Sequence, residues 1–458
     1  MENVFVPNYD KTVAELDAAF RLKASFDLLG REVKVGSRRA RLYLVDGFCK
    51  DDLMEKIMAY FMKATDDVIQ GLADTRAFAD TYVPYVETDV VAKRVEFITA
   101  VLSGAVGMIV EGFAEAIVID ARTYPSRSVD EPENDRVLRG AHDGFVETIV
   151  FNTALIRRRI RDTALTMEAH SAGEKAKTDI VICYMDGKAK PELLDVVRKK
   201  IDGIRINSLS MSQQSLIECL VPKQRYNPFP KVRYTERPDA AAASVLEGSI
   251  VILTDNSPAA MIIPTGIFDF LQDTNDYYMS PFVGSYMRIV RMIIFALTLL
   301  LIPVWYLLTK NPDHIPQWLD FIRIEEPNSV PVLVQLLIVE LVIDAMRLAS
   351  INTPNALSSS FGVIGALVLG EFAVSAGWFV PEVVLYMAFV ALSNFAQPSF
   401  ELGYAFKILR VVLIILVAFF NLWGLIGGVV LIALLLATTK TVTGPVSYTH
   451  LRAHETKA

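Results

Sequence analysis

Three charged side chains interrupt a hydrophobic segment in the second half of this sequence. The segment PVLVQLLIVELVIDAMRLAS, residues 331–350, contains Glu340, Asp344 and Arg347, and otherwise has the length and composition of a transmembrane helix. A charged group in the hydrocarbon core of a bilayer is costly, and such groups mark ion paths, proton relays or internal ion pairs. The chemistry that these residues suggest is therefore the handling of ions.

The spacing of these residues places them on one side of a helix. Positions i, i+4 and i+7 share one stripe of a helix with 3.6 residues per turn. Two carboxylates facing a water-filled oligomer axis would concentrate cations, as acidic rings do in channels. Alternatively, the stripe is neutralised inside the protein, with Arg347 pairing with Asp344 or reaching toward the membrane surface. The sequence leaves both interpretations open.

Two uncharged runs flank this segment. The run 292–308 follows Arg288 and Arg291 and precedes an acidic loop, which by the positive-inside rule predicts a cytoplasmic N-terminal half. The run 411–437 has the length of one long tilted span rather than two. It contains a GxxxG pair, Gly424 and Gly428, which is typical of close helix packing.

Another hydrophobic region, residues 361–380, has small residues four positions apart. These residues are Gly362, Ala366 and Gly370, and they predict a helix-packing face. The same glycines, followed by Glu371, equally fit a re-entrant or broken helix that lines an aqueous path. The run 383–397 is short enough for a half-span, so we expect four to five crossings in total.

The distribution of charge divides the chain of 458 residues into two parts. Residues 1–285 contain 77 Asp, Glu, Lys and Arg residues, whereas residues 286–440 contain only 17. The first part has the composition of one or two soluble domains, and the second has that of a membrane domain. We expect a fold made of a cytoplasmic N-terminal α/β module with two subdomains, followed by an α-helical polytopic membrane domain.

The local patterns suggest boundaries within this plan. Alternating residues predict a β-hairpin over 32–48, and a second one that turns at Glu111-Gly112. The expected segments are an N-terminal tail (1–30), a first α/β subdomain with a linking helix (31–162), a second α/β subdomain (163–285), the transmembrane domain (286–440) and a non-native tail (441–458). The last of these ends in SYTHLRAHETKA, which resembles a translated sequencing adapter, so we expect the natural C-terminus to be missing.

Several functional classes are disfavoured. The net charge of −7 and the lack of a long basic run argue against a nucleic-acid partner. The three cysteines, Cys49, Cys183 and Cys219, are too scattered for a metal cluster and are expected to be reduced core residues. The sequence has no phosphate-binding loop, dinucleotide fingerprint, nucleophile elbow or HExxH motif, so we expect neither an enzyme nor a cofactor.

A run of basic residues ends the predicted linking helix at positions 157, 158, 159 and 161. Such a run can bind phosphate or lipid. The simpler interpretation is a solvated helix end, which complements the helix dipole and has acidic partners nearby. We favour the simpler interpretation.

Several stretches together resemble the A-subunit family of spore germination proteins. They are DARTYPSRSVDEPENDRVLRGAHDGFVETIVFNTALIRRRIRD (120–162), NPFPKVRYTERPDAAAASVLEGSIVILTDNSPAAMIIPT (227–265), GVIGALVLGEFAV and PSFELGYAFKILR. The resemblance runs in one order from about residue 30 to 440, and the form YPSRS–DEP–VLRGAHDGFVE is most similar to the stage V sporulation branch. That family continues past its last span into a basic, proline-containing tail, which this sequence lacks.

The resemblance implies a multi-pass protein of the spore inner membrane or cell membrane with a cytoplasmic N-terminal module. It further implies a ring-like homo-oligomer that conducts monovalent cations and works with other germination membrane subunits. A non-conducting receptor or scaffold that signals to a separate channel is the alternative.

Overall fold

The computed structural model describes residues 4–5, 8–49, 51–65, 72, 74–123, 135–221, 226–326, 328–351, 371–442 and 444–445. The chain forms two compact units. The first unit comprises residues 1–223, 232–265 and 441–443, and the second comprises residues 224–231, 266–440 and 444–458. Each unit is described separately below.

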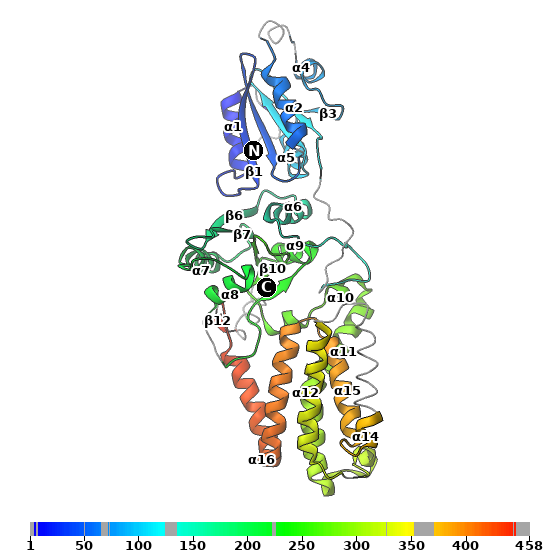
Figure 1. The fold of residues 1–458 in the computed structure, drawn as a ribbon. Helices are drawn as coiled ribbons and strands as arrows, with labels where there is room; N and C mark the ends of the chain where they lie inside the picture. Colours follow the sequence, from blue (N-terminus) through cyan, green and yellow to red (C-terminus); the bar gives the residue numbers. More distant parts are fainter. Residues whose placement is uncertain are drawn as a thin grey trace. The chain divides into compact units, whose positions relative to one another are not determined.

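The first unit begins with a five-stranded antiparallel sheet covered by helices (Figure 1). The strands lie in the order β1-β2-β4-β5-β3. The elements are α1 (Tyr9–Ala19), β1 (Leu28–Val35), β2 (Arg38–Val45), α2 (Asp51–Met62), α4 (Thr75–Tyr82), β3 (Thr88–Val91), α5 (Arg94–Leu102), β4 (Val106–Val110) and β5 (Ala116–Ile119). Both predicted hairpins are present, and Gly36 and Gly112 in their turns have φ values of +59° and +89°, which glycine adopts without strain.

A second five-stranded antiparallel sheet follows in the same unit, with the strand order β6-β7-β9-β10-β8. Its elements are α6 (Ile149–Arg159), β6 (Leu165–Ala172), β7 (Thr178–Met185), α7 (Pro191–Asp202), α8 (Ser212–Leu220), β8 (Arg233–Thr235), α9 (Pro238–Leu246), β9 (Ile250–Thr254) and β10 (Ala260–Ile263). Alternate residues of β7 pack into separate cores on the two faces of this sheet, which explains why residues 180–185, IVICYM, form a continuous apolar run.

The two α/β subdomains repeat one topology. Among the described elements of each subdomain, a helix precedes two strands, two helices, a strand, a helix and two strands, and each sheet has the same order of strands. The repeat includes the segment that precedes the first helix of each subdomain. Phe5 lies four residues before α1 and donates its N–H to the carbonyl of Ala92, whereas Phe145 lies four residues before α6 and donates to Glu236. The segment expected to be an N-terminal tail thus supplies α1, whose Leu16 is buried in the first subdomain.

One fully buried ion pair joins the two subdomains. Arg157, at 0 % exposure, donates from Nε to Asp27 at 2.7 Å, and its Nη2 donates to the Ser25 hydroxyl at 3.1 Å and to the Leu165 carbonyl at 3.1 Å. The expectation of a solvated helix end was therefore wrong for Arg157. Arg159 has the expected acidic partner, Asp143, at 2.6 Å.

The second unit is mainly helical. Its elements are η1 (Ile267–Leu271), α10 (Thr274–Tyr278), α11 (Pro281–Lys310), η2 (Pro312–His314), η3 (Gln317–Ile322), α12 (Val332–Ile351), α14 (Ala373–Ser375), α15 (Pro381–Phe395) and α16 (Phe400–Thr438). Two short strands, β11 (Lys440–Thr441) and β12 (Gly444–Pro445), follow α16 in the chain. Among the described residues, α11 and α16 are the two helices long and apolar enough to cross a membrane. The expectation of four to five crossings stays a prediction.

Helix α16 is a hairpin, so the expectation of one long tilted span over 411–437 was wrong. Asn421 leaves the helical conformation at φ +52° and ψ −131°, and the chain reverses there (Figure 1). The second arm returns along the first, with Ile432, Leu435 and Leu436 against the cluster that contains Leu402, Phe406 and Leu409. Nothing in an uncharged apolar run marks such a reversal, apart from the asparagine itself.

Candidate functional site

The acidic stripe of α12 faces the first arm of α16. Glu340 is 4 % exposed, and Arg410 is 1 % exposed. Nε and Nη2 of Arg410 lie 2.8 Å and 2.6 Å from Oε1 of Glu340. Nη1 of Arg410 donates to the carbonyl oxygen of Thr298 on α11 at 2.9 Å, so this guanidinium joins three helices. The arrangement satisfies both charges of a buried pair.

Asp344 and Glu340 share a second basic partner. The ammonium of Lys407 forms an ion pair with Asp344, lies 3.5 Å from Oε2 of Glu340 and donates to the carbonyl oxygen of Glu340 at 3.4 Å. Lys407 is 8 % exposed, whereas the Asp344 side chain is 36 % exposed. The cluster thus contains two carboxylates and two basic groups.

Arg347 completes the contact between the two helices. Its guanidinium carbon lies 4.7 Å from the centre of the Phe400 ring and 5.0 Å from that of Tyr404, within the range of a cation–π interaction. Positions 340, 344 and 347 therefore meet positions 410, 407 and 404 in turn, which is an antiparallel register. We call these residues the charge zipper: Glu340, Asp344, Arg347, Tyr404, Lys407 and Arg410.

The zipper explains how an apolar helix carries three charges. Removing charges from water costs several kcal/mol per ion, which is offset only where the pair is well hydrogen-bonded. Here the carboxylates and their basic partners neutralise one another within one chain. Asp344 forms its ion pair with Lys407 of α16. The pore-lining role of the stripe stays a prediction.

Sequence reasoning missed Lys407 and Arg410 as part of this site. Both residues precede the uncharged run 411–437, and in that position a basic residue is typical of the cytoplasmic end of a span. Their spacing of three residues places them on one helix face, which matches the acidic pair at 340 and 344. This match between a basic pair and an acidic pair of similar spacing is the sequence signal that could have identified Lys407 and Arg410.

The other predicted residues lie apart from the zipper. The structure does not describe the predicted packing residues Gly362, Ala366 and Gly370. Glu371 is the first residue of the described range 371–442, and it is exposed. Gly424 and Gly428 are buried where the two arms of α16 meet. A Cβ atom on Gly424 would lie 2.1 Å from the carbonyl oxygen of Leu416, and one on Gly428 would lie 2.4 Å from Cδ2 of Leu413.

Polar side chains hold the tip of the α16 hairpin. The Asn421 and Asn311 side chains exchange two hydrogen bonds, of 3.0 Å and 2.7 Å. The ammonium of Lys310 donates to the carbonyl oxygens of Val417 and Ala418, at 3.3 Å and 2.7 Å. Because the helix breaks at Asn421, these carbonyls lose their usual partners, and Lys310 satisfies them in the manner of a helix C-cap.

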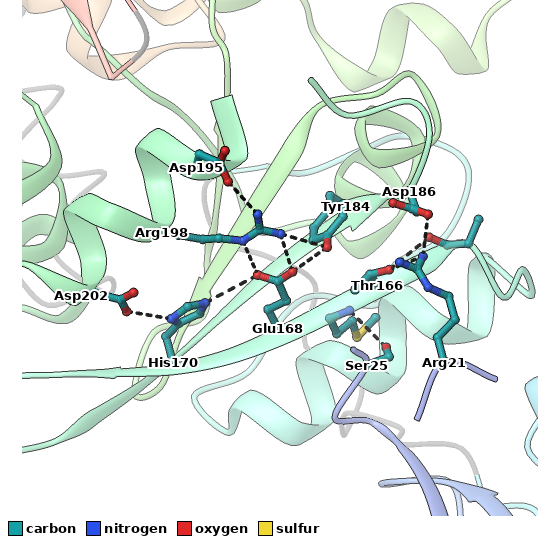
Figure 2. A network of polar contacts seen from close by, with 12 residues as sticks. Arg21, Ser25, Thr166, Glu168, His170, Tyr184, Asp186, Asp195, Arg198 and Asp202 are labelled. Carbon is teal, nitrogen blue, oxygen red and sulfur yellow. Dashed lines mark hydrogen bonds and ion pairs between the residues drawn. The ribbon is translucent and has the colours of Figure 1, made fainter. Parts of the chain in front are cut away.

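A separate polar network lies on the second sheet, around Glu168 (Figure 2). Glu168 accepts from Tyr184 at 2.5 Å and from Nε of Arg198 at 2.8 Å, and Nε2 of His170 lies 3.7 Å away. Nδ1 of His170 lies 3.1 Å from Asp202. These contacts tie β6 and β7 to α7.

The pKa values of this network follow from its contacts. Burial raises the pKa of Glu168, but the contacts with His170, Arg198 and Tyr184 outweigh burial and hold that pKa well below its usual range. The contact with Glu168 raises the pKa of His170 despite partial burial, and Asp202 adds to this effect. The polar groups of this network contact one another and connect β6, β7 and α7, so we interpret the network as structural.

Metal and thiol chemistry find little support in the described part of the chain. No group of three or more His, Cys, Asp or Glu side chains there has the geometry of a metal site. Cys183 is buried, and burial raises the pKa of its thiol. Cys219 is exposed, so the expectation of a core residue was wrong at that position.

Comparison with known proteins gives a consistent picture. Residues 16–455 match the family described as Bacillus/Clostridium GerA spore germination protein. Stage V sporulation protein AF of Bacillus subtilis (strain 168) is 39 % identical over 428 residues, which cover 92 % of this chain and 85 % of that protein. Spore germination protein KA of the same organism is 27 % identical, over 96 % of this chain and 81 % of that protein.

Part of the chain is also similar to a solved structure. It is the N-terminal domain of the A subunit of the Bacillus megaterium spore germinant receptor GerK3. The match has 23 % sequence identity and a TM-score of 0.43, and covers 57 % of this chain and 95 % of that structure.

Proposed function

Because this chain belongs to the GerA family of spore germination proteins, we propose that it is a membrane subunit of the germination machinery that forms a ring-like oligomer and conducts monovalent cations. In this proposal the helical unit is a multi-pass domain in the spore inner membrane or cell membrane. The two α/β subdomains are cytoplasmic, and other germination membrane subunits are partners.

The observation that carries this proposal is the pair of carboxylates in the charge zipper. Glu340 and Asp344 lie on α12 beside α11 and α16, the two helices that are apolar enough to span a bilayer. Ionisable groups inside a membrane domain are costly to maintain and are functional candidates by default. Carboxylates attract cations and exclude anions, so they suit a cation path.

A second candidate function rests on the basic side of the zipper. Lys407 and Arg410 neutralise both carboxylates, and a neutral ion-pair network is also a means of fixing two helices in one register. The alternative is therefore a receptor or scaffold subunit that does not conduct and signals to a separate channel. The two functions differ in whether the purified protein carries ions.

Flux through reconstituted protein tests the proposal. Purified protein in liposomes is expected to release K⁺ and Na⁺, and Glu340→Gln with Asp344→Asn is expected to alter that flux while leaving membrane assembly intact. Asp313→Asn with Glu326→Gln is the matched control, because both residues are exposed and lie outside the zipper. Tight liposomes that contain correctly assembled protein would contradict conduction and favour the scaffold function.

A further inference from the structure

We infer that a girdle of exposed aromatic side chains at one end of the helical unit lies in the interfacial layer of a lipid bilayer, where hydrocarbon meets headgroups. The members of this aromatic girdle come from η3, from the turn before α15 and from the tip of the α16 hairpin: Trp318, Phe321, Trp378, Phe419, Phe420 and Trp423. The inference rests on the proposed function for the membrane location of the helical unit. It adds which end of the unit meets the bilayer surface and where the α16 hairpin ends.

Contacts within the helical unit hold the three segments at the same end. Asn421, at the tip of the α16 hairpin, exchanges hydrogen bonds with Asn311, the residue that follows α11. The carbonyl oxygen of Ile322, the last residue of η3, accepts from the indole of Trp305 near the end of α11 at 3.0 Å. Val380, the residue before α15, packs in the same hydrophobic cluster as Trp305 and Ile322. The girdle residues therefore gather around the end of α11.

The four tryptophans of the chain differ in burial. Trp305 is 3 % exposed and its N–H has the carbonyl partner named above, whereas Trp318, Trp378 and Trp423 are 75 %, 62 % and 77 % exposed. An indole has a large apolar surface and one N–H donor, so it suits a layer that is apolar on one side and hydrated on the other. Tryptophan and tyrosine are accordingly enriched at both membrane–water interfaces.

The surface next to the girdle has the composition and the length of a lipid-facing one. The exposed large side chains along the second arm of α16 beyond its tip are aliphatic, and they include Ile426, Val430 and Leu434. Near the opposite end of α11, Tyr286 is 60 % exposed. The helix from Tyr286 to Lys310 is about 36 Å long at about 1.5 Å per residue. This length matches a hydrocarbon core of about 30 Å with part of the interfacial layers.

Charges beside the girdle favour the bilayer surface over a second copy of the chain as its occupant. Asp320 lies between Trp318 and Phe321 in the sequence and forms an exposed ion pair with Arg323 at 2.6 Å. The cores of protein–protein interfaces are depleted of charged residues. The headgroup layer, in contrast, accommodates aromatic rings and charged side chains next to each other.

A girdle at this level has a consequence for the α16 hairpin. Asn421 lies at the bilayer surface, so both arms of α16 cross the bilayer. The arms comprise residues 400–420 and 422–438, and both fall within the range of about 17–25 residues for a spanning helix. With the α/β subdomains in the cytoplasm, α11 starts on the cytoplasmic side, and the girdle lies on the opposite face of the membrane.

The test is depth-dependent fluorescence quenching of the full-length protein in phosphatidylcholine vesicles. Three variants each keep Trp305 and one girdle tryptophan, with phenylalanine at the other two positions. The matched control, Trp318→Phe with Trp378→Phe and Trp423→Phe, keeps Trp305 alone. Trp305 stays in every variant because its hydrogen bond holds η3, and the replaced side chains are exposed, so the fold is expected to persist. The quenchers are a nitroxide on the lipid headgroup, a nitroxide in the middle of the acyl chain and iodide in the water.

Each girdle tryptophan is expected to be quenched at least about twofold more by the headgroup nitroxide than by the mid-chain nitroxide, because indoles lie at the headgroup level. The control is expected to lose little emission to any quencher. Quenching by iodide but by neither lipid probe overturns the inference, because the girdle then faces water. Stronger mid-chain quenching of Trp423 overturns it because the hairpin then ends inside the hydrocarbon. Absence of quenching by all three probes overturns it too, and shows that a second copy covers the girdle.

These outcomes are independent of ion flux. Tight liposomes with the expected headgroup quenching refute conduction and keep the girdle. Conducting liposomes without headgroup quenching refute the girdle and keep conduction.

Discussion

Gly424 packs directly against the backbone of Leu416 across the α16 hairpin. A Cβ atom at residue 424 would lie 2.1 Å from the carbonyl oxygen of Leu416, which is closer than any real contact. Gly427, three residues further along the same arm, has open space at its Cβ position. The hairpin therefore requires a glycine at residue 424 and does not require one at residue 427.

We expect Gly424→Ala to separate the two arms and to destabilise the helical unit by about 2 kcal/mol or more, because the clash is with backbone rather than with a flexible side chain. Gly427→Ala is the matched control and is expected to cause no loss, since alanine has a higher helix propensity than glycine. Thermal unfolding of both variants in detergent checks this. Equal loss in the two variants would contradict the close approach at residue 424.

The Glu340–Arg410 pair should stabilise the helical unit far more than an exposed pair does. Removing one partner of a buried ion pair costs about 3–5 kcal/mol, whereas an exposed pair contributes about 0–1 kcal/mol. Arg410→Gln is therefore expected to unfold well below wild type, and Arg323→Gln, whose ion pair with Asp320 is exposed, is expected to match wild type. Glu340→Gln in the Arg410→Gln background should recover part of the loss. A small effect of Arg410→Gln would show that the pair is solvated.

The junction of the two α/β subdomains should depend on Arg157. Both Arg157 and Asp27 are buried, at 0 % and 1 % side-chain exposure, so Arg157→Met leaves an unpaired carboxylate and should cost about 3–5 kcal/mol. Arg76→Met, which breaks an exposed pair with Asp80, is the control and should cost less than about 1 kcal/mol. Urea unfolding of the full chain, followed by protease sensitivity between residues 135 and 165, measures the difference. Matching unfolding midpoints of the two variants would contradict this role of the Arg157–Asp27 ion pair.

Stability of the second subdomain should decrease as the pH rises above 6.5. The pKa of His170 is raised above its usual value of 6.5 by Glu168 and Asp202, so the folded state binds this proton more tightly than the unfolded state does. The resulting stabilisation is complete below pH 6.5 and is lost as the pH rises through the folded-state pKa. Unfolding midpoints from pH 5.5 to 8.5 should show this slope in wild type and lose it in His170→Gln. An unchanged slope in the variant would assign the effect to another group.

Local features of the fold were predictable because their causes are local. The two hairpins of the first subdomain followed from alternation around turn residues, and Gly112 at the second turn has the positive φ that its turn needs. Strand β8 is three residues long, and helix α1 is weakly amphipathic, so neither has a pattern that distinguishes it from a loop or tail. The duplicated topology leaves no obvious sequence repeat, since it is a property of strand order.

Only the part of the candidate site that lies on α12 was predictable from the sequence. The period of the helix places Glu340, Asp344 and Arg347 on one stripe, and the structure keeps them together. Their partners lie 60 to 70 residues further along the chain, at Lys407 and Arg410, and no local rule joins two such segments. The hairpin at Asn421 was hidden for a different reason: an uncharged apolar run has no periodicity that reports a reversal.

The symmetry of purified particles tests the central claim most directly. Electron cryo-microscopy of the full-length protein in lipid nanodiscs is expected to show a ring with cyclic symmetry about an axis normal to the membrane, with the contact between α12 and α16 bordering that axis. A monomeric particle, or a ring in which Glu340 and Asp344 lie far from the axis, would contradict the proposal of an oligomeric cation channel.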